Sequence, residues 1–209
     1  MSILRGVMVL LAALVGPAIL ADPGERELEG LQSWLDGTQR LEARFEQELQ
    51  SGALGAGLTE SGSLILARPG RMRWDYLDPE FKVALFEGDR MELYLEEEAQ
   101  LIRTPIPEDG DLLPSLLAGR GRLADLFRCE GVERSGSTLH LKLIPRRESE
   151  TLEELTVSVR RKDSSIQAVE VRDAAGNLTA YRFRDLRRNG TLPADAFAFT
   201  PPPGTEILE

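Results

Sequence analysis

Residues Ser61–Tyr76 read SGSLILARPGRMRWDY, and this stretch decides what kind of fold the chain adopts. On both sides of the Pro69-Gly70 pair, every second residue falls on one face, and that face is apolar except at Arg68. Alternation with a period of two is typical of a β-strand that buries one face, and a Pro-Gly pair is typical of a turn. The stretch therefore predicts two strands joined by a turn. The apolar residues of the shared face are Leu64, Leu66, Met72, Trp74 and Tyr76.

The same period of two recurs along most of the remaining chain. The alternating segments are separated by turn-forming pairs such as Gly88-Asp89 and Gly176-Asn177. With the first two strands, they make roughly nine to eleven strands. No linker, low-complexity tract or repeat of fixed period divides the chain, so we expect a single domain. The further strands are expected over residues 41–50, 82–86, 90–95, 139–143, 155–159, 167–171, 179–183 and 197–199.

Helical spacing occurs in three short segments. Residues 28–35 carry apolar side chains three and four positions apart, and Gly37 follows as a helix stop. Residues 112–117 and 123–127 also carry apolar faces of helical spacing. On periodicity alone, these last two segments are as compatible with a crossover packed on the core as with a cover over a cavity.

Three short helices are too few to cover the apolar face of so many strands. A sheet of this size curls, and a curled sheet that does not close leaves a hydrophobic hollow on its inner side. The expected fold is therefore mainly β with short helices, and the expected ligand is apolar. The side chains expected to line the hollow are Phe45, Leu64, Leu66, Met72, Trp74, Tyr76, Leu116 and Leu117.

The N-terminus follows the layout of a secretion signal. A short, positively charged start ending at Arg5 precedes the apolar run Val7–Val15, which is too short to span a bilayer. Ala18 and Ala21 then provide small residues for cleavage. We expect residues 1–21 to be a signal peptide and residues 22–209 to form the mature domain. The alternative is a buried N-terminal helix.

The chain is strongly acidic, with a formal net charge of −10. This charge repels phosphate backbones and anionic membrane surfaces, which argues against nucleic acid as a partner and against tight adsorption to a bilayer. Cys129 is the single cysteine, so no internal disulfide can form, and stability has to come from a hydrophobic core.

No set of residues suited to catalysis stands out in the sequence. His140, the only histidine, lies between two leucines of an expected strand and should face outward. One histidine and one cysteine cannot make a typical zinc site, and neither a phosphate-binding loop nor a nucleophile elbow occurs. We therefore expect no enzyme activity, no metal and no cofactor. A hydrolase of acyl esters is the alternative, and it would need a nucleophile, a base and an acid around the hollow.

Arg68 allows two interpretations. It shares the parity of Leu64 and Leu66, which directs it toward the hollow. It is either an arginine at the end of a strand that reaches solvent as the Pro69 turn begins, or a rim arginine. A rim arginine would donate hydrogen bonds to carbonyl groups across the mouth of the cavity.

Several motifs follow one another along the chain. Gly62–Tyr76 has the pattern G-x-L-x-L-x-R-P-G-R-x-R-W-x-Y, and Asp173–Phe183 has the pattern D-x-x-G-N-x-T-x-Y-x-F. Shorter motifs are Phe45 and Gln47 (F-x-Q), Asp78-Pro79, Leu93-Tyr94, and Phe197–Gly204 (F-x-F-x-P-P-x-G). In this order, and over essentially the whole mature chain, the motifs resemble those of the LolA family.

The resemblance implies a half-open antiparallel β-barrel with an α-helical lid over a hydrophobic cavity. It also implies a periplasmic carrier without a cofactor, which takes acylated lipoproteins from an inner-membrane ABC transporter and passes them to an outer-membrane receptor. In the family, the arginine of the R-P pair holds the empty lid closed, and Arg68-Pro69 matches that pair. We expect the mature protein to be a monomer. The alternatives on the same fold are a carrier of another lipid or glycolipid, and a lipid-sensing regulator of envelope stress.

Overall fold

The computed structural model describes residues 23–52, 57–106, 121–149 and 151–209. The expected signal peptide over residues 1–21 lies outside these ranges, and so do Leu116 and Leu117. Among the described residues, no helix is both long enough and apolar enough to cross a membrane.

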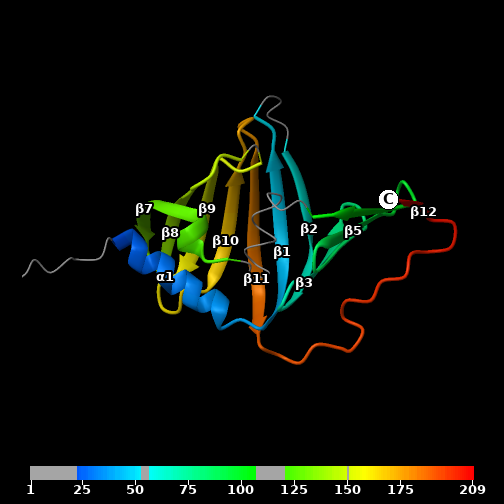
Figure 1. Ribbon diagram of the computed structural model, residues 1–209, viewed down its shortest axis with the longest axis horizontal. Helices are drawn as coiled ribbons and strands as arrows, with labels where there is room; N and C mark the ends of the chain where they lie inside the picture. Colours follow the sequence, from blue (N-terminus) through cyan, green and yellow to red (C-terminus); the bar gives the residue numbers. More distant parts are fainter. Residues whose placement is uncertain (1–22, 53–56, 107–120, 150) are drawn as a thin grey trace, which may run out of the picture.

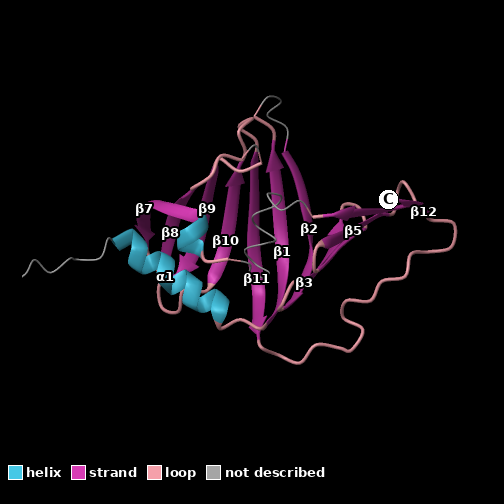
Figure 2. Ribbon diagram, viewed as in Figure 1, coloured by secondary structure: helices cyan, strands magenta, loops and turns pink. Residues whose placement is uncertain are grey.

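The described part of the chain forms one sheet of twelve strands with two short helices (Figures 1 and 2). The helices are α1 (Pro23–Asp36) and α3 (Leu123–Leu126). The strands are β1 (Arg40–Gln50), β2 (Gly57–Ala67), β3 (Arg71–Asp78), β4 (Lys82–Glu87), β5 (Arg90–Leu95), β6 (Gln100–Pro105), β7 (Phe127–Ser135), β8 (Thr138–Pro145), β9 (Glu154–Arg160), β10 (Ile166–Arg172), β11 (Leu178–Arg188) and β12 (Glu206–Leu208).

The strand order in the sheet is β12-β6-β5-β4-β3-β2-β1-β11-β10-β9-β8-β7. Neighbouring strands run antiparallel, except that β12 runs parallel to β6. β1 joins the two halves of the chain, because it pairs with β2 on one side and with β11 on the other. The sheet is open and curled (Figure 1). The mainly β fold predicted from the sequence, with a curled sheet that does not close into a full barrel, is confirmed.

β2 and β3 form the hairpin that the sequence predicts. Leu64 lies opposite Trp74, and Leu66 lies opposite Met72. All four side chains are buried on one face of the sheet. Because the side-chain period of a strand is two, this register places these four side chains together on the inner face.

Gly62 allows three strands to approach closely at the start of this hairpin. It lies opposite Phe45 on β1 and next to Asp75 on β3. A Cβ atom at this position would clash with the carbonyl oxygen of Asp75 and would come within 3.0 Å of the Phe45 ring. A residue without a side chain is therefore needed for the ring of Phe45 to pack against the sheet here.

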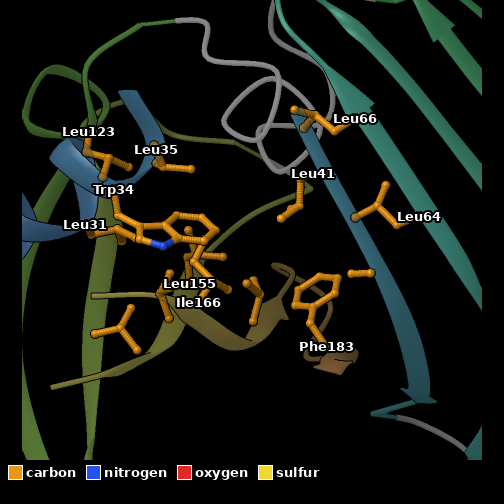
Figure 3. Packing of buried hydrophobic residues seen from close by; sticks show 14 of the residues in the cluster. Leu31, Trp34, Leu35, Leu41, Leu64, Leu66, Leu123, Leu155, Ile166 and Phe183 are labelled. Carbon is orange, nitrogen blue, oxygen red and sulfur yellow. The ribbon is translucent and has the colours of Figure 1, made fainter. Parts of the chain in front are cut away.

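α1 covers the part of the inner face that β7 to β10 form (Figure 1). Its apolar side is buried, with Leu31 fully covered and Trp34 5% exposed. Figure 3 shows these two side chains beside Leu155 of β9 and Ile166 of β10. Burying each such side chain stabilises the fold by about 1.5–3 kcal/mol. The helix predicted over residues 28–35 is therefore confirmed, and packing on the sheet holds it in place.

The end of α1 is tied to the end of β11. Arg188 donates from Nη2 to the Trp34 carbonyl oxygen at 3.0 Å and from Nε to Thr38 Oγ1 at 2.8 Å. Asn189 donates from Nδ2 to the Gly37 carbonyl oxygen at 2.9 Å. The last carbonyl groups of a helix have no partner within it, so these side chains supply the missing donors. They fix α1 at one end of the inner face.

The strand predicted over residues 197–199 is wrong. Phe197 ends a turn, and Phe199 lies in irregular chain. The guanidinium of Arg71 lies 4.8 Å from the centre of the Phe197 ring, and the Phe199 ring lies 5.1 Å from that of Tyr94. The two phenylalanines alternate with polar or small residues because both pack onto the sheet. The segment itself adds no strand to the sheet. The Asn189-Gly190 pair follows the end of β11 and leads into this segment.

Three strands, β6, β7 and β12, have no counterpart in the sequence prediction. The helix predicted over residues 123–127 ends at Leu126, and Phe127 begins β7. β7 forms one edge of the sheet within the described ranges, and charged residues such as Arg128, Glu130 and Glu133 occupy its exposed positions. Edge strands commonly carry charge, which hides the apolar alternation that marks inner strands.

Candidate functional site

A cavity of about 440 Å³ lies on the inner face of the sheet. β3, β4 and β5 supply one wall, and β9, β10 and β11 supply the opposite wall. The lining residues are mostly apolar. They are Trp74, Tyr76, Ala84, Phe86, Met91, Leu93, Leu95, Leu152, Leu155, Val171 and Tyr181, together with the polar residues Glu60, Lys82, Thr151, Asp173, Asn177 and Thr179.

Aromatic rings connect the two walls. The ring centres of Trp74 on β3 and Tyr181 on β11 are 5.6 Å apart, although β2 and β1 separate these strands in the sheet. Trp74 also meets Phe45 of β1 edge-on, with the ring centres 4.9 Å apart. Aromatic pairs at these distances, whether tilted or edge-to-face, are favourable beyond the area they bury. The curl of the sheet therefore brings side chains from distant parts of the sequence to one apolar surface.

The structure separates the predicted cavity residues into two groups. Trp74 and Tyr76 line the cavity. Phe45, Leu64, Leu66 and Met72 share their face of the sheet but are only 1–3% exposed, within the core cluster beside the cavity. Their contact with a ligand stays a prediction, as does the role of Leu116 and Leu117.

Several cavity residues were not expected from the sequence. Phe86 of β4, Met91 and Leu93 of β5, and Val171 of β10 all line the cavity. Each lies in a strand that the alternation predicts, so the apolar face of the strand was available as a signal. The alternation shows which face of each strand is apolar. It does not show whether that face lines a cavity, because this depends on how the sheet curls.

The cavity has a polar end. Glu60 of β2 and Lys82 of β4 form an ion pair, and the Lys82 ammonium lies 4.9 Å from the centre of the Tyr76 ring between them. Tyr76 Oη donates to Gln47 Oε1 at 3.0 Å. Glu60 is only 4% exposed and Gln47 only 6% exposed, so both are buried polar residues on a face that is mostly apolar.

Asp173 belongs to the same end of the cavity. Its carboxylate accepts hydrogen bonds from Asn177 Nδ2 at 2.7 Å and from the backbone N–H groups of Ala175 and Asn177 at 2.9 Å. These hydrogen bonds, with that of the Asn177 side chain the largest, hold the pKa of Asp173 below its ordinary value. Asp173 thus organises the β10–β11 turn and adds a second carboxylate to the cavity lining.

Arg68 lies at the other end of the inner face, directly after β2. Its backbone N–H donates to the Gln39 carbonyl oxygen at 2.9 Å, and its side chain is partly buried. Burial lowers the pKa of Arg68 from its ordinary value, and the negative charge of Asp36 at the end of α1 opposes this shift. The structure thus places Arg68 near the helix that covers the inner face. Its role in closing a lid stays a prediction.

His140 lies on the outer face of the sheet. Its Nδ1 is 2.8 Å from Ser158 Oγ, and Ser158 is 6% exposed. Ser158 has the parity opposite to Leu155, which lines the cavity on the inner face. The sheet therefore separates this serine and histidine from the cavity, and the pair does not supply the catalytic set that an acyl-ester hydrolase would need there.

The chain is similar to outer-membrane lipoprotein carrier proteins. Residues 36–200 match the family described as outer membrane lipoprotein carrier protein LolA. The carrier protein of Cupriavidus taiwanensis is 30% identical over 209 residues, 95% of each chain, and that of Chromobacterium violaceum is 26% identical over 201 residues, 96% of each chain. An uncharacterized conserved protein from Thermus thermophilus shares the fold, with a TM-score of 0.56 and 13% identity over 90% of this chain and 99% of that chain. Because the family match spans most of the sequence, the chain belongs to the LolA family of outer membrane lipoprotein carrier proteins.

Proposed function

We propose that the protein is a periplasmic carrier that binds the acyl chains of lipoproteins released from the inner membrane and delivers them to the outer membrane. The observation that most supports this function is the cavity of about 440 Å³ with its wall of Trp74, Phe86 and Leu93, in a chain of the LolA family. A volume of this size is typical of sites that enclose small ligands, and an apolar wall suits a hydrocarbon chain.

The energetics of acyl chains explain why a carrier is needed. An acyl chain of about sixteen carbons costs on the order of 10 kcal/mol to expose to water, at ~0.8 kcal/mol per CH₂ group. The carrier has to offset most of this cost and still release the chain at its destination. A closed, empty state that competes with the cargo lowers the affinity and makes release feasible.

The remaining parts of the proposal follow the family. Residues 1–21 direct export to the periplasm, an inner-membrane ABC transporter supplies the cargo, and an outer-membrane receptor accepts it. Arg68 stabilises the closed, empty state. Its partly buried place near the end of α1 supports this role, because a charged donor at that position can reach groups that cover the inner face.

Two measurements test the proposed function. The first is mass spectrometry of lipid that co-purifies with the mature protein from its native compartment, where we expect acylated lipoprotein or its lipopeptide. The second is displacement of a neutral apolar fluorophore, N-phenyl-1-naphthylamine, by a triacylated lipopeptide, where we expect saturable competition.

Matched variants connect the binding to the cavity. Leu93→Asp places a charge on the cavity wall and should abolish displacement. Leu77→Asp makes the same change at a leucine that is 56% exposed outside the cavity, and should leave displacement unchanged. A protein that shows no saturable binding of either compound would contradict the proposal, as would co-purification of another lipid class alone.

A further inference from the structure

The polar end of the cavity is built from charged residues on an otherwise apolar face. Glu60, Tyr76 and Lys82 come from three adjacent strands, and all three point to the inner side. Lys82 contacts both neighbours, as the ion-pair partner of Glu60 and as the cation over the Tyr76 ring. The group is therefore a connected arrangement that faces the cavity.

Stability alone does not account for this arrangement. Replacing a buried ion pair by well-packed apolar residues of similar volume is often neutral or stabilising, because both charges lose their hydration on burial. The side chains of Glu60 and Lys82 are only 6% and 21% exposed, yet Lys82 lies opposite Leu95 of β5, and the next inward-facing position of β4 is Ala84. A role in recognition explains why charges are present here.

The charges of the cavity lining favour one sign of ligand. Two carboxylates, Glu60 and Asp173, and one ammonium group, Lys82, line the cavity. Lys82 is already paired with Glu60, so the field at this end is negative. A carboxylate or phosphate that entered would be repelled, and this repulsion is stronger in a site partly screened from water than in bulk solution.

An uncharged amide or ester suits the same group of residues. A lysine ammonium has three N–H donors, so Lys82 can keep its bond to Glu60 and donate to a carbonyl oxygen as well. An amide also carries one N–H donor, which a Glu60 carboxylate oxygen can accept. Acyl chains joined to their cargo by amide and ester bonds present these groups, whereas free fatty acids and anionic phospholipids present a negative charge.

We propose that the cavity discriminates by charge, admitting acyl chains that end in uncharged amides or esters and rejecting anionic amphiphiles, with Glu60 as the residue that sets this discrimination. The inference rests on the proposed lipid-carrier function and specifies its ligand class. It assigns to Glu60, Lys82 and Asp173 a selective role at the polar end of an apolar cavity.

The test compares three ligands that share one acyl chain. N-methyl lauramide, methyl laurate and sodium laurate compete with N-phenyl-1-naphthylamine for the full mature protein at neutral pH. We expect the amide and the ester to bind at least about tenfold more tightly than laurate, a ratio that corresponds to about 1.4 kcal/mol. Equal affinities for all three ligands would overturn the inference and leave the proposed carrier function in place. Failure of every ligand to displace the probe would overturn both.

Two variants should shift the discrimination in opposite directions. Glu60→Gln removes a negative charge with little change in shape. The affinity for laurate should therefore rise about tenfold relative to that for the amide. Lys82→Met removes the positive charge, so the affinity for laurate should fall further relative to that for the amide. Glu97→Gln, in the exposed turn between β5 and β6, makes the same charge change outside the cavity and should leave the ratio unchanged. The inference fails if the first two variants shift the ratio in the same direction or if neither shifts it, and the second variant keeps the test decisive if Glu60→Gln does not fold.

Discussion

The guanidinium of Arg188 lies over the indole ring of Trp34, 4.7 Å from its centre, while Nη2 of the same side chain donates to the Trp34 carbonyl oxygen at 3.0 Å. One residue at the end of β11 thus contacts both the ring and the backbone at the end of α1. Because α1 covers part of the inner face, this contact links the helix to the strand that carries the cavity residue Tyr181.

The first prediction follows from this contact. Arg188→Ala should lower the free energy of unfolding by about 1–3 kcal/mol, because it removes the donor to the buried Thr38 Oγ1 and one of the two donors to the Trp34 carbonyl oxygen. Chemical denaturation followed by circular dichroism measures this change. Arg187→Ala, at the exposed neighbouring position, should change stability by no more than about 0.5 kcal/mol. Equal effects of the two variants would show that the contact does not hold the helix.

The second prediction concerns Trp74. The chain has two tryptophans, so Trp34→Phe leaves Trp74 as the only one. Trp74 lines the cavity, and a bound acyl chain should replace water near its ring and shift its emission to shorter wavelength. Titration with a non-fluorescent triacylated lipopeptide measures the shift. The reciprocal variant, Trp74→Phe, reports only on Trp34 under α1 and should respond much less. An emission of Trp74 that saturating lipopeptide does not move would contradict its place in the ligand site.

The third prediction concerns Arg68. Arg68→Leu removes the charged donor proposed to stabilise the closed, empty state and adds apolar surface near the cargo. Binding of lipopeptide should persist or tighten, and transfer to the acceptor should weaken, because the closed state no longer competes with the cargo. A transfer assay with receptor-containing acceptor vesicles measures this. Arg68→Lys keeps the charge but loses the planar guanidinium group with its several N–H donors. Its effect on binding and transfer should therefore lie between those of the parent and Arg68→Leu. A solvated strand-end arginine would instead change either step by no more than about 0.5 kcal/mol.

The fourth prediction concerns pH. The pKa of Asp173 is lower in the folded protein than in the unfolded chain, so its ionisation stabilises the fold above the ordinary pKa of an aspartate. This contribution is lost as the pH falls through the folded-state pKa. The melting temperature of Asp173→Asn should therefore lie furthest below that of the parent near neutral pH and approach it under acid conditions. Asp89→Asn, in a different exposed turn, controls for the loss of one negative charge. A difference that does not depend on pH would contradict this role for Asp173.

The inner strands of the sheet other than β6 could be predicted because each carries its own signal. In β3, Met72, Trp74 and Tyr76 face one side and charged residues face the other, and the observed burial follows this parity. The edge strands lack such a signal. β7 has charge at its exposed positions, and β12 has three exposed residues that reach β6 only after the long connection from β11. The alternation at Phe197 and Phe199 wrongly predicts a strand. A segment that packs every second side chain onto a sheet shows the same alternation as a strand, although it adds no strand to the sheet.

The candidate site was predictable only in part. Trp74 and Tyr76 were expected in the cavity, and the structure places them there. The opposite wall, with Leu155, Val171 and Tyr181, lies about eighty to a hundred residues further along the chain, and no local pattern relates it to Trp74. Glu60 and Lys82 gave no sequence signal of pairing, because they meet only through the register of β2, β3 and β4.

Local sequence patterns were therefore sufficient to predict a large, mainly β sheet with one apolar face, too few helices to cover it, and motifs that resemble those of the LolA family. Alternation, turn pairs and motifs are local, so they can be read along the chain without knowing which strands meet. The folded structure was needed to show which apolar side chains face a cavity and which lie in the packed core, and to show the ion pair at one end of that cavity. These features depend on the curl of the sheet and on pairing between β1 and β11, and such long-range contacts arise only when the whole chain has folded.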